Sequence, residues 1–344
     1  MPAFVPSAIQ TLPSLWRYRR LLPPLPEEAT VSMMEGWTPL VRVPLSAGEV
    51  SCKMDFLLPT GSYKDRGATL LVSYLKAAGA PHVHDDSSGN AGAALAGYCA
   101  RAGIPCDLYI PAHASGGKLA QIQAYGARLV PVPGPREEAK KASMADAASF
   151  YASHNWHPLF FEGVKTYAWE VWEQLGRAAP DHVVVPCGYG SLVIGAYRGF
   201  KALRDAGEID RLPRIFAVQA SACSPVYQAF AQGAGDVVPV TPGTTLAEGI
   251  ASGSPLRGRE ILEAVRATDG AVVTVTEDEI VRALRLLARR GMFVEPTAAA
   301  APAAADRLLR EGRLRAADET VVVLTGNGLK AWEKIRPLLE GGVS

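Results

Sequence analysis

Lys64 lies in a short string of polar and turn-forming residues, LPTGSYKDRGA at positions 58–68, between an apolar run and an amphipathic run. The proline and the first glycine are typical of a turn, and Thr60 or Ser62 could cap a helix that follows. At the start of that helix, the positive end of the helix dipole disfavours a second positive charge and so favours a neutral amine. A neutral amine attacks aldehydes, whereas the ordinary alternative is a solvated lysine beside a capped helix.

Three further strings with chemical potential follow predicted strands. DSSGNAG at 86–92 offers hydroxyls, free backbone N–H groups and one amide, which could bind an anion or simply cap a helix. CGYGSLVIG at 187–195 could cradle a phosphate or form a tight turn, and it is not the dinucleotide fingerprint because Val193 occupies the third glycine position. TGNGLK at 325–330 begins with a hydroxyl that could bond a flat heterocycle, or it could be another turn.

Together these groups match what pyridoxal 5′-phosphate needs. Lys64 would form the imine with the aldehyde, and the glycine turn would take the phosphate. Asn90 would meet the phenolic oxygen, and the Thr325 hydroxyl would meet the pyridine nitrogen. A nicotinamide or ATP enzyme would not need the lysine.

Composition excludes several other classes of protein. The 344 residues are 48% hydrophobic and 20% charged, which is typical of a globular protein, and the formal net charge of +1 does not favour nucleic acid or an anionic membrane as partner. No apolar run approaches the roughly 20 residues that span a bilayer, and the N-terminal residues do not resemble a signal peptide. Five scattered cysteines suit a reducing cytoplasm, and the histidine pairs at 82/84 and 154/157 are expected to be structural or on the surface, with no metal site.

Alternating strand-like and helical stretches predict an α/β fold with two mostly parallel sheets covered by helices. One predicted helix runs over residues 137–153. We expect a smaller domain at 46–154, carrying Asn90, and a larger domain formed by 1–45 and 155–344. The active site is expected in the cleft between them.

The motifs resemble those of the fold-type-II pyridoxal-phosphate enzymes (the tryptophan synthase β-like superfamily), and within them the threonine synthase family. PTGSYKDRGA, SSGNAGAALAGYCA, CGYGSL and TGNGLK carry the resemblance, with support from GWTPL at 36–40, EGVKT at 162–166, AEGI at 247–250 and EPT at 295–297. It implies a lyase of threonine biosynthesis that converts O-phospho-L-homoserine and water to L-threonine and phosphate. It also implies a homodimer.

The resemblance carries roles over to individual residues. Lys64 would be the Schiff-base lysine and the main catalytic group. The cofactor would be bound by the residues matching its family contacts, namely Lys64, Asn90, Gly188, Tyr189, Gly190, Ser191, Leu192 and Thr325. The substrate would be bound by Ser87, Ser88, Gly89, Ala91, Lys118 and Lys165.

Two positions depart from the threonine synthase pattern. Phe160 stands where an arginine usually helps to hold the substrate's phosphate, and Ser191 stands where asparagine is usual. Lys118, Lys165 or Arg66 could replace the missing cation. The alternative activity is therefore a threonine/serine ammonia-lyase, or another β-eliminating or β-replacing enzyme of the same fold.

Overall fold

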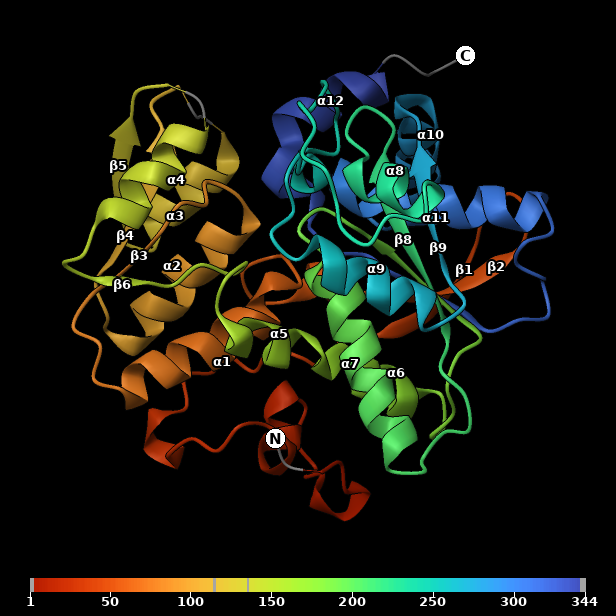
Figure 1. Cartoon of the computed structure of the whole chain (residues 1–344), viewed down its shortest axis with the longest axis horizontal. Coiled ribbons are helices and arrows are strands. Elements are labelled where there is room, and N and C mark those ends of the chain that lie inside the picture. Colours follow the sequence, from red (N-terminus) through yellow and green to blue (C-terminus); the bar gives the residue numbers. More distant parts are fainter. Residues whose placement is uncertain (1–2, 114–115, 135, 341–344) are drawn as a thin grey trace. The chain divides into compact units, whose positions relative to one another are not determined.

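The computed structural model describes residues 3–113, 116–134 and 136–340, which divide into two units. The first unit contains Ser7–Gly36 and Leu58–Val164. The second contains Ala3–Pro6, Trp37–Leu57 and the chain from Lys165 onward. Each unit is built on its own sheet, and the α/β class with parallel sheets that the sequence predicts is confirmed (Figure 1).

The first unit holds a four-stranded, wholly parallel sheet in the order β5-β4-β3-β6. Its strands are β3 (Val83–Asp85), β4 (Cys106–Pro111), β5 (Arg128–Val132) and β6 (Phe150–Tyr151). Its helices are α1 (Lys64–Ala77), α2 (Asn90–Ala102), α3 (Gly117–Ala124), α4 (Arg136–Ala145) and α5 (Pro158–Val164). Helix α4 packs on β3, β4 and β5, and α1 packs against both α2 and α5 (Figure 1).

The helix predicted over residues 137–153 is wrong in its second half. Helix α4 ends at Ala145, and strand β6 follows. Phe150 donates its backbone N–H to the His82 carbonyl at 3.2 Å, and Ala152 donates to the His84 carbonyl at 2.8 Å. The edge of the sheet thus offers this aromatic segment partners that the local sequence cannot reveal.

The second unit holds a six-stranded sheet in the order β1-β2-β10-β7-β8-β9, parallel except for the β1–β2 pair. Its strands are β1 (Leu40–Pro44), β2 (Glu49–Lys53), β7 (His182–Pro186), β8 (Arg214–Ala220), β9 (Ala271–Val275) and β10 (Thr320–Val323). Its helices are α6 (Thr166–Gln174), α7 (Ser191–Asp205), α8 (Pro225–Ala231), α9 (Gly258–Arg266), α10 (Glu277–Arg289), α11 (Pro296–Arg310) and α12 (Trp332–Glu340). Short 3-10 turns complete the described structure at Pro6–Ala8, Leu15–Leu21, Glu27–Ala29, Asp55–Leu57, Glu248–Ile250 and Gly328–Ala331.

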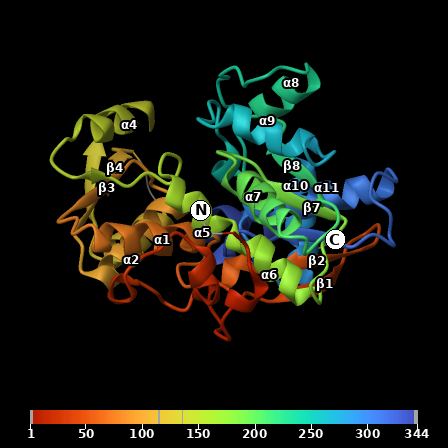
Figure 2. The ribbon, with the colours of Figure 1, turned by 60° about the horizontal axis from the view of Figure 1, so that its bottom comes forward.

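The core of the second unit lies between its sheet and the alanine-rich helix α11. This helix packs along β7, β8, β9 and β10, with α10 against its side (Figures 1 and 2). Alternate strand residues such as Val184, Val218 and Val273 are buried in the same cluster as its alanines. Small side chains on a buried helix allow it to lie close to a sheet that is apolar on both faces.

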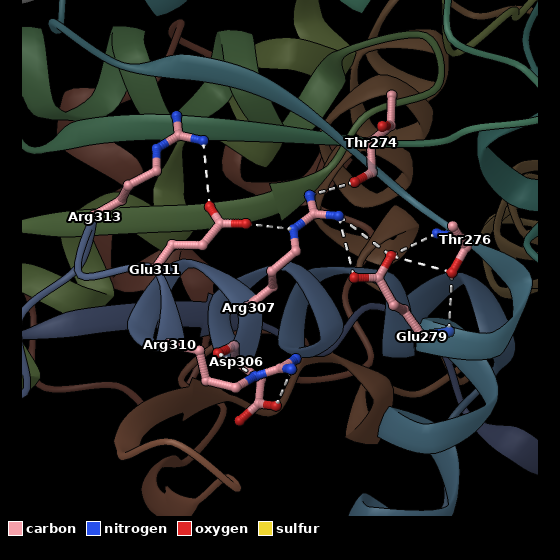
Figure 3. Close-up of polar contacts among 8 residues, drawn as sticks. All are labelled: Thr274, Thr276, Glu279, Asp306, Arg307, Arg310, Glu311 and Arg313. Atoms are coloured by element: carbon pink, nitrogen blue, oxygen red, sulfur yellow. Dashed lines mark hydrogen bonds and ion pairs between the residues drawn. The ribbon is translucent and has the colours of Figure 1, made fainter.

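Polar contacts join α10, α11 and the end of β9. Arg307 of α11 lies 3.1 Å from the Glu279 carboxylate and donates to the Thr274 carbonyl at 2.5 Å (Figure 3). Glu279 also closes a capping box with Thr276 at the start of α10. One carboxylate therefore caps a helix and anchors its neighbour at the same time.

A buried ion pair lies at the end of strand β2 in the second unit. Lys53, the last residue of β2, places its Nζ 2.7 Å from the Glu170 carboxylate, and both side chains are fully buried. The same ammonium donates to the Thr38 carbonyl at 2.7 Å and to Gln174 Oε1 at 2.8 Å. Three acceptors match its three donors, which is the condition for burying an ammonium.

Within the described residues, no helix is both long enough and apolar enough to cross a membrane.

Candidate active site

Helix α1 begins at Lys64, as the sequence predicts, but its start is stabilised differently. Neither Thr60 nor Ser62 caps it, because the residue before the helix is Tyr63 and makes no side-chain capping bond. Instead the Asp65 carboxylate reaches back and accepts the Thr60 backbone N–H at 2.7 Å and the Thr60 hydroxyl proton. The turn before Lys64 is thus held by a first-turn carboxylate, which the helix dipole also favours.

The Lys64 amine lies among aromatic rings. Its Nζ is 4.8 Å from the centre of the Tyr63 ring and 5.5 Å from the centre of the Phe160 ring. It makes no hydrogen bond or ion pair with any residue in the described ranges. An amine without a carboxylate partner remains available for a covalent bond to an aldehyde.

Two glycines allow α1 and α5 to lie in direct contact beside this lysine. A Cβ on Gly67 would lie 2.5 Å from the Phe160 ring, and a Cβ on Gly163 would overlap the Arg66 carbonyl oxygen. The EGVKT string therefore packs, at its glycine, on the string that contains Lys64. Helix α3 also contacts this string, since Gln121 Nε2 donates to the Thr60 carbonyl at 3.0 Å.

The loop from Ser87 to Ala91 is a tight turn against the start of α2. A Cβ on Gly92 would overlap the Ser87 carbonyl oxygen, so only glycine permits this approach. The Gly89 N–H donates to Ser87 Oγ at 3.3 Å, and Ser87 and Ala91 are buried while Ser88 is half-buried. Helix α2 begins at Asn90 without a side-chain cap, so the alternative that Ser88 or Asn90 serves as a cap is not met.

Acidic and basic side chains gather behind this loop, at the end of β3. The Tyr151 hydroxyl donates to Asp86 at 2.6 Å, and His154 Nδ1 lies 3.7 Å from the Asp85 carboxylate. Burial raises the pKa of Asp85 to about 6. Burial also lowers the pKa of His154 well below its ordinary value, and the positive charge of Lys64 lowers it further.

The sequence analysis predicts a structural or surface role for His154 and does not place this histidine near Lys64. The two groups lie by the same ring, since the imidazole centre is 5.7 Å from that of Phe160. The only indication in the sequence that His154 could lie near Lys64 is that it precedes the EGVKT string at 162–166. Among the described residues, no group of three or more His, Cys, Asp or Glu could hold a metal ion.

The glycine turn of the second unit lies between β7 and α7. Helix α7 begins at Ser191 after Gly190, whose φ of 81° is a left-handed conformation that favours glycine. A Cβ there would overlap the Ile261 side chain. Ser191 and Leu192 are buried and Tyr189 is half-buried. A helix that begins directly after a glycine turn directs the N–H groups of its first turn toward that turn, an arrangement that suits an anion.

Two distant motifs pack behind this turn. A Cβ on Gly188 would lie 2.9 Å from the Gly249 carbonyl oxygen, and a Cβ on Gly249 would lie 2.9 Å from Thr297 Oγ1. The Gly249 N–H donates to that same hydroxyl at 3.0 Å. The AEGI and EPT strings therefore support the cradle by close backbone contact.

Thr325 follows β10, the strand beside β7, so it lies at the same edge of the sheet as Gly188. The residue is 3% exposed, and its hydroxyl makes no hydrogen bond with the described residues. A buried hydroxyl without a protein partner can bond a ring nitrogen.

The two candidate substrate lysines differ in burial. Lys118 is the second residue of α3 in the first unit and is half-buried. Lys165 of the second unit is buried, with its Nζ 4.8 Å from the centre of the Trp169 ring.

The chain belongs to the family described as "Pyridoxal-phosphate dependent enzyme", whose sequence profile matches residues 31–326. An unengaged lysine amine, a glycine cradle before a helix and a buried free hydroxyl fit pyridoxal 5′-phosphate, the cofactor of that family.

Within the family, the chain is similar to threonine synthases. It is 37% identical over 325 residues to the threonine synthase of Methanocaldococcus jannaschii, covering 92% of this chain and 80% of that protein. It is 35% identical to that of Synechocystis sp., covering 96% of this chain and 87% of that protein.

Solved structures show the same fold. The threonine deaminase of T.th. has a TM-score of 0.72 at 27% identity, covering 84% of this chain and 92% of that one. The processed threonine deaminase isoform 2 of Solanum lycopersicum has a TM-score of 0.77 at 19% identity, covering 99% and 94%.

Gly190→Ala tests the cradle against a matched control. Gly207 has a similar φ of 74° but open space around it, so Gly207→Ala should cost only the backbone strain of ~1–2 kcal/mol in free energy of unfolding. Gly190→Ala should cost a further ~1–3 kcal/mol through overlap with Ile261, and should weaken retention of the cofactor. Urea unfolding and cofactor content after dialysis measure both effects. Equal behaviour of the two variants would contradict the packing described for Gly190.

Asp85→Asn tests the buried acid. The folded protein holds the Asp85 proton more tightly than the unfolded chain, since its pKa rises from 3.8 to about 6. This group therefore costs stability as pH rises from about 4 to about 6, and the cost then stays constant. Relative to wild type, Asp85→Asn should gain roughly 2–3 kcal/mol in free energy of unfolding across that window.

The control for this pH profile is Asp210→Asn, which changes an exposed aspartate of the other unit. This variant should not reproduce the gain in free energy of unfolding that is expected for Asp85→Asn. A profile for Asp85→Asn that runs parallel to that of wild type would contradict the raised pKa of Asp85.

Proposed function

We propose that the protein is a threonine synthase that converts O-phospho-L-homoserine and water to L-threonine and phosphate. The observation that carries the proposal is the Lys64 amine, which stands at the start of α1 without a hydrogen bond or ion pair among the described residues. The choice of threonine synthase rests on similarity to relatives of that name over 92–96% of the chain.

In this proposal, residues from several separate motifs bind one cofactor. Pyridoxal 5′-phosphate supplies the electron sink that stabilises negative charge on the substrate's carbons. In the first unit, Lys64 holds the cofactor and moves protons at the substrate's α, β and γ carbons, and Asn90 bonds the cofactor's phenolic oxygen. In the second unit, Gly188–Leu192 bind its phosphate and the Thr325 hydroxyl donates to its ring nitrogen. A neutral hydroxyl there leaves that nitrogen unprotonated and moderates the electron sink.

The substrate's carboxylate is assigned to the loop made by Ser87, Ser88, Gly89 and Ala91. Support comes from the tight turn that Gly92 permits, which leaves backbone N–H groups at the start of α2. Lys118 and Lys165 are the cations proposed for the substrate's own phosphate. The proposal also includes a homodimer in the cytoplasm, as the resemblance implies.

A second candidate function, threonine/serine ammonia-lyase, is favoured by one specific observation. Phe160, in place of the family's arginine, is 2% exposed and faces the Lys64 amine with an uncharged ring. The buried carboxyl groups of Asp85 and Asp86 behind the loop also disfavour a dianionic phosphate ester nearby. A hydroxyl amino acid would face no such repulsion.

Lys64→Ala should abolish turnover and the cofactor's absorbance at roughly 410 nm, because both need that amine. Lys76→Ala is the matched control, since Lys76 is an exposed lysine on the same helix and should keep both properties. Circular dichroism and urea unfolding would verify that the Lys64 variant is folded. Near wild-type turnover in a folded Lys64→Ala protein would remove Lys64 from its proposed role.

Side-by-side assays on O-phospho-L-homoserine, L-threonine and L-serine decide between the two functions. Threonine synthase predicts phosphate release with threonine formation, at a kcat/KM well above that for deamination of threonine. Phe160 replaces the arginine that would bond the substrate's phosphate, and such a charge-assisted contact is worth ~1.5–3 kcal/mol of binding free energy. Unless another cation compensates, phosphohomoserine should therefore bind roughly one to two orders of magnitude more weakly than it would with arginine at this position. Ammonia and 2-oxobutyrate from threonine, without phosphate release from phosphohomoserine, would establish the ammonia-lyase instead.

A further inference from the structure

A basic cavity of about 540 Å³ opens in the second unit, at the amino ends of its parallel strands. Two aspartates and His182 lie among the residues that line it. Its cations are Arg211, Arg214, Arg313 and Arg315. Cavities that bind small molecules commonly have volumes of roughly 300–1,000 Å³.

Both aspartates of the cavity are already engaged by the protein. Asp181 pairs with Arg211 and accepts the Glu319 backbone N–H at 2.7 Å. Asp318 lies 3.0 Å from both His182 Nε2 and Arg315 Nη2. These two contacts, led by the bond to His182, lower the pKa of Asp318. The aspartates thus hold two of the arginines in place.

The other two arginines are paired less closely than these or not at all. Arg214 donates its Nε to the Asp269 carbonyl at 2.9 Å and makes no ion pair with the described residues. Arg313 lies 3.8 Å from Glu311, a carboxylate that Arg307 also approaches at 3.5 Å (Figure 3). The lining therefore holds two more cations than anions.

His182 adds a second, independent feature. The residue is 5% exposed and lines the cavity, and its Nδ1 has no hydrogen-bond partner in the part of the chain that the structure describes. Its Nε2 is fixed by Asp318, which sets the orientation of the ring. A buried ring nitrogen without a protein partner is rare unless a ligand or water completes it.

The cavity is distinct from the phosphate cradle. His182 and Arg214 are the first residues of β7 and β8 and pair in register. The cradle begins at Gly188, beyond the other end of β7. Six residues of extended chain separate the two places by roughly 20 Å.

We propose that this cavity binds a small multivalent oxyanion, a molecule with two or more phosphate or carboxylate groups. Planar guanidinium groups bond the oxygens of both kinds of anion in pairs. Arg214, which has no ion pair among the described residues, and Arg313, which lies 3.8 Å from a Glu311 carboxylate that it shares with Arg307, supply the charge for the anion. Arg211 and Arg315 are held by their aspartates and shape the walls. The ring of His182, which Asp318 fixes through Nε2, forms part of the lining.

Isothermal titration of the holoenzyme with pyrophosphate and with citrate tests the site at low ionic strength. The holoenzyme is used because its own cofactor phosphate then fills the cradle. We expect at least one of the two anions to bind, with an affinity that falls as salt is added. The double variant Arg214→Gln/Arg313→Gln should bind it about tenfold or more weakly.

The matched control is Arg289→Gln/Arg290→Gln, which removes the same charge from two exposed arginines of the same unit. It should bind within about twofold of wild type. Binding of pyrophosphate alone would assign phosphate groups to the ligand, and binding of citrate alone would assign carboxylates. Failure of both anions to bind, or equal effects of the two double variants, would overturn the site. Neither readout depends on turnover, so the result is independent of the proposed activity.

Discussion

The position of Lys64 depends on the close contact between helices α1 and α5. Gly67 and Gly163 remove the two Cβ atoms that would otherwise separate these helices, and Phe160 fills the space beside the lysine. Because packed helices transmit small shifts, a larger residue at either glycine would displace the amine. The Lys64 amine is therefore positioned by the close approach of two backbones rather than by hydrogen bonds to its own side chain.

In the second unit, the parallel strands position the candidate cofactor-binding residues. Neighbouring strands β7 and β10 end at the same edge of the sheet, so the turn at Gly188 and the hydroxyl of Thr325 are brought together by topology. The contacts of Gly188 with Gly249 and of Gly249 with Thr297 then fix the turn from behind. The opposite edge of the same sheet carries the basic cavity. A parallel sheet thus gives one domain two chemically different ends.

Buried ionisable groups in both units differ in how completely partners surround them. Lys53 has three acceptors, including Glu170, and the ion pair is fully buried. Glu35 accepts bonds from Thr69, Tyr98 and the Met33 backbone, although burial still raises its pKa. Asp85 has weaker compensation, and its pKa is raised to about 6. A buried acid with a shifted pKa, such as Asp85 next to the Ser87–Ala91 loop, is more typical of a functional region than of a structural one.

The sequence by itself determined the fold class, the start of α1 at Lys64 and the cofactor family, because turn chemistry, strand–helix alternation and glycine strings are local properties of the chain. Tertiary structure alone decided the end of α4 and the strand at Phe150, since an edge strand needs a partner strand. It also decided that Asp65 holds the turn at Thr60, that His154 lies by the Phe160 ring, and that Arg214 and Arg313 line one cavity. The strand pairing and the cavity join residues that are far apart in the chain, and the contacts of Asp65 and His154 depend on how the chain turns between near neighbours. The order of the residues alone does not specify either.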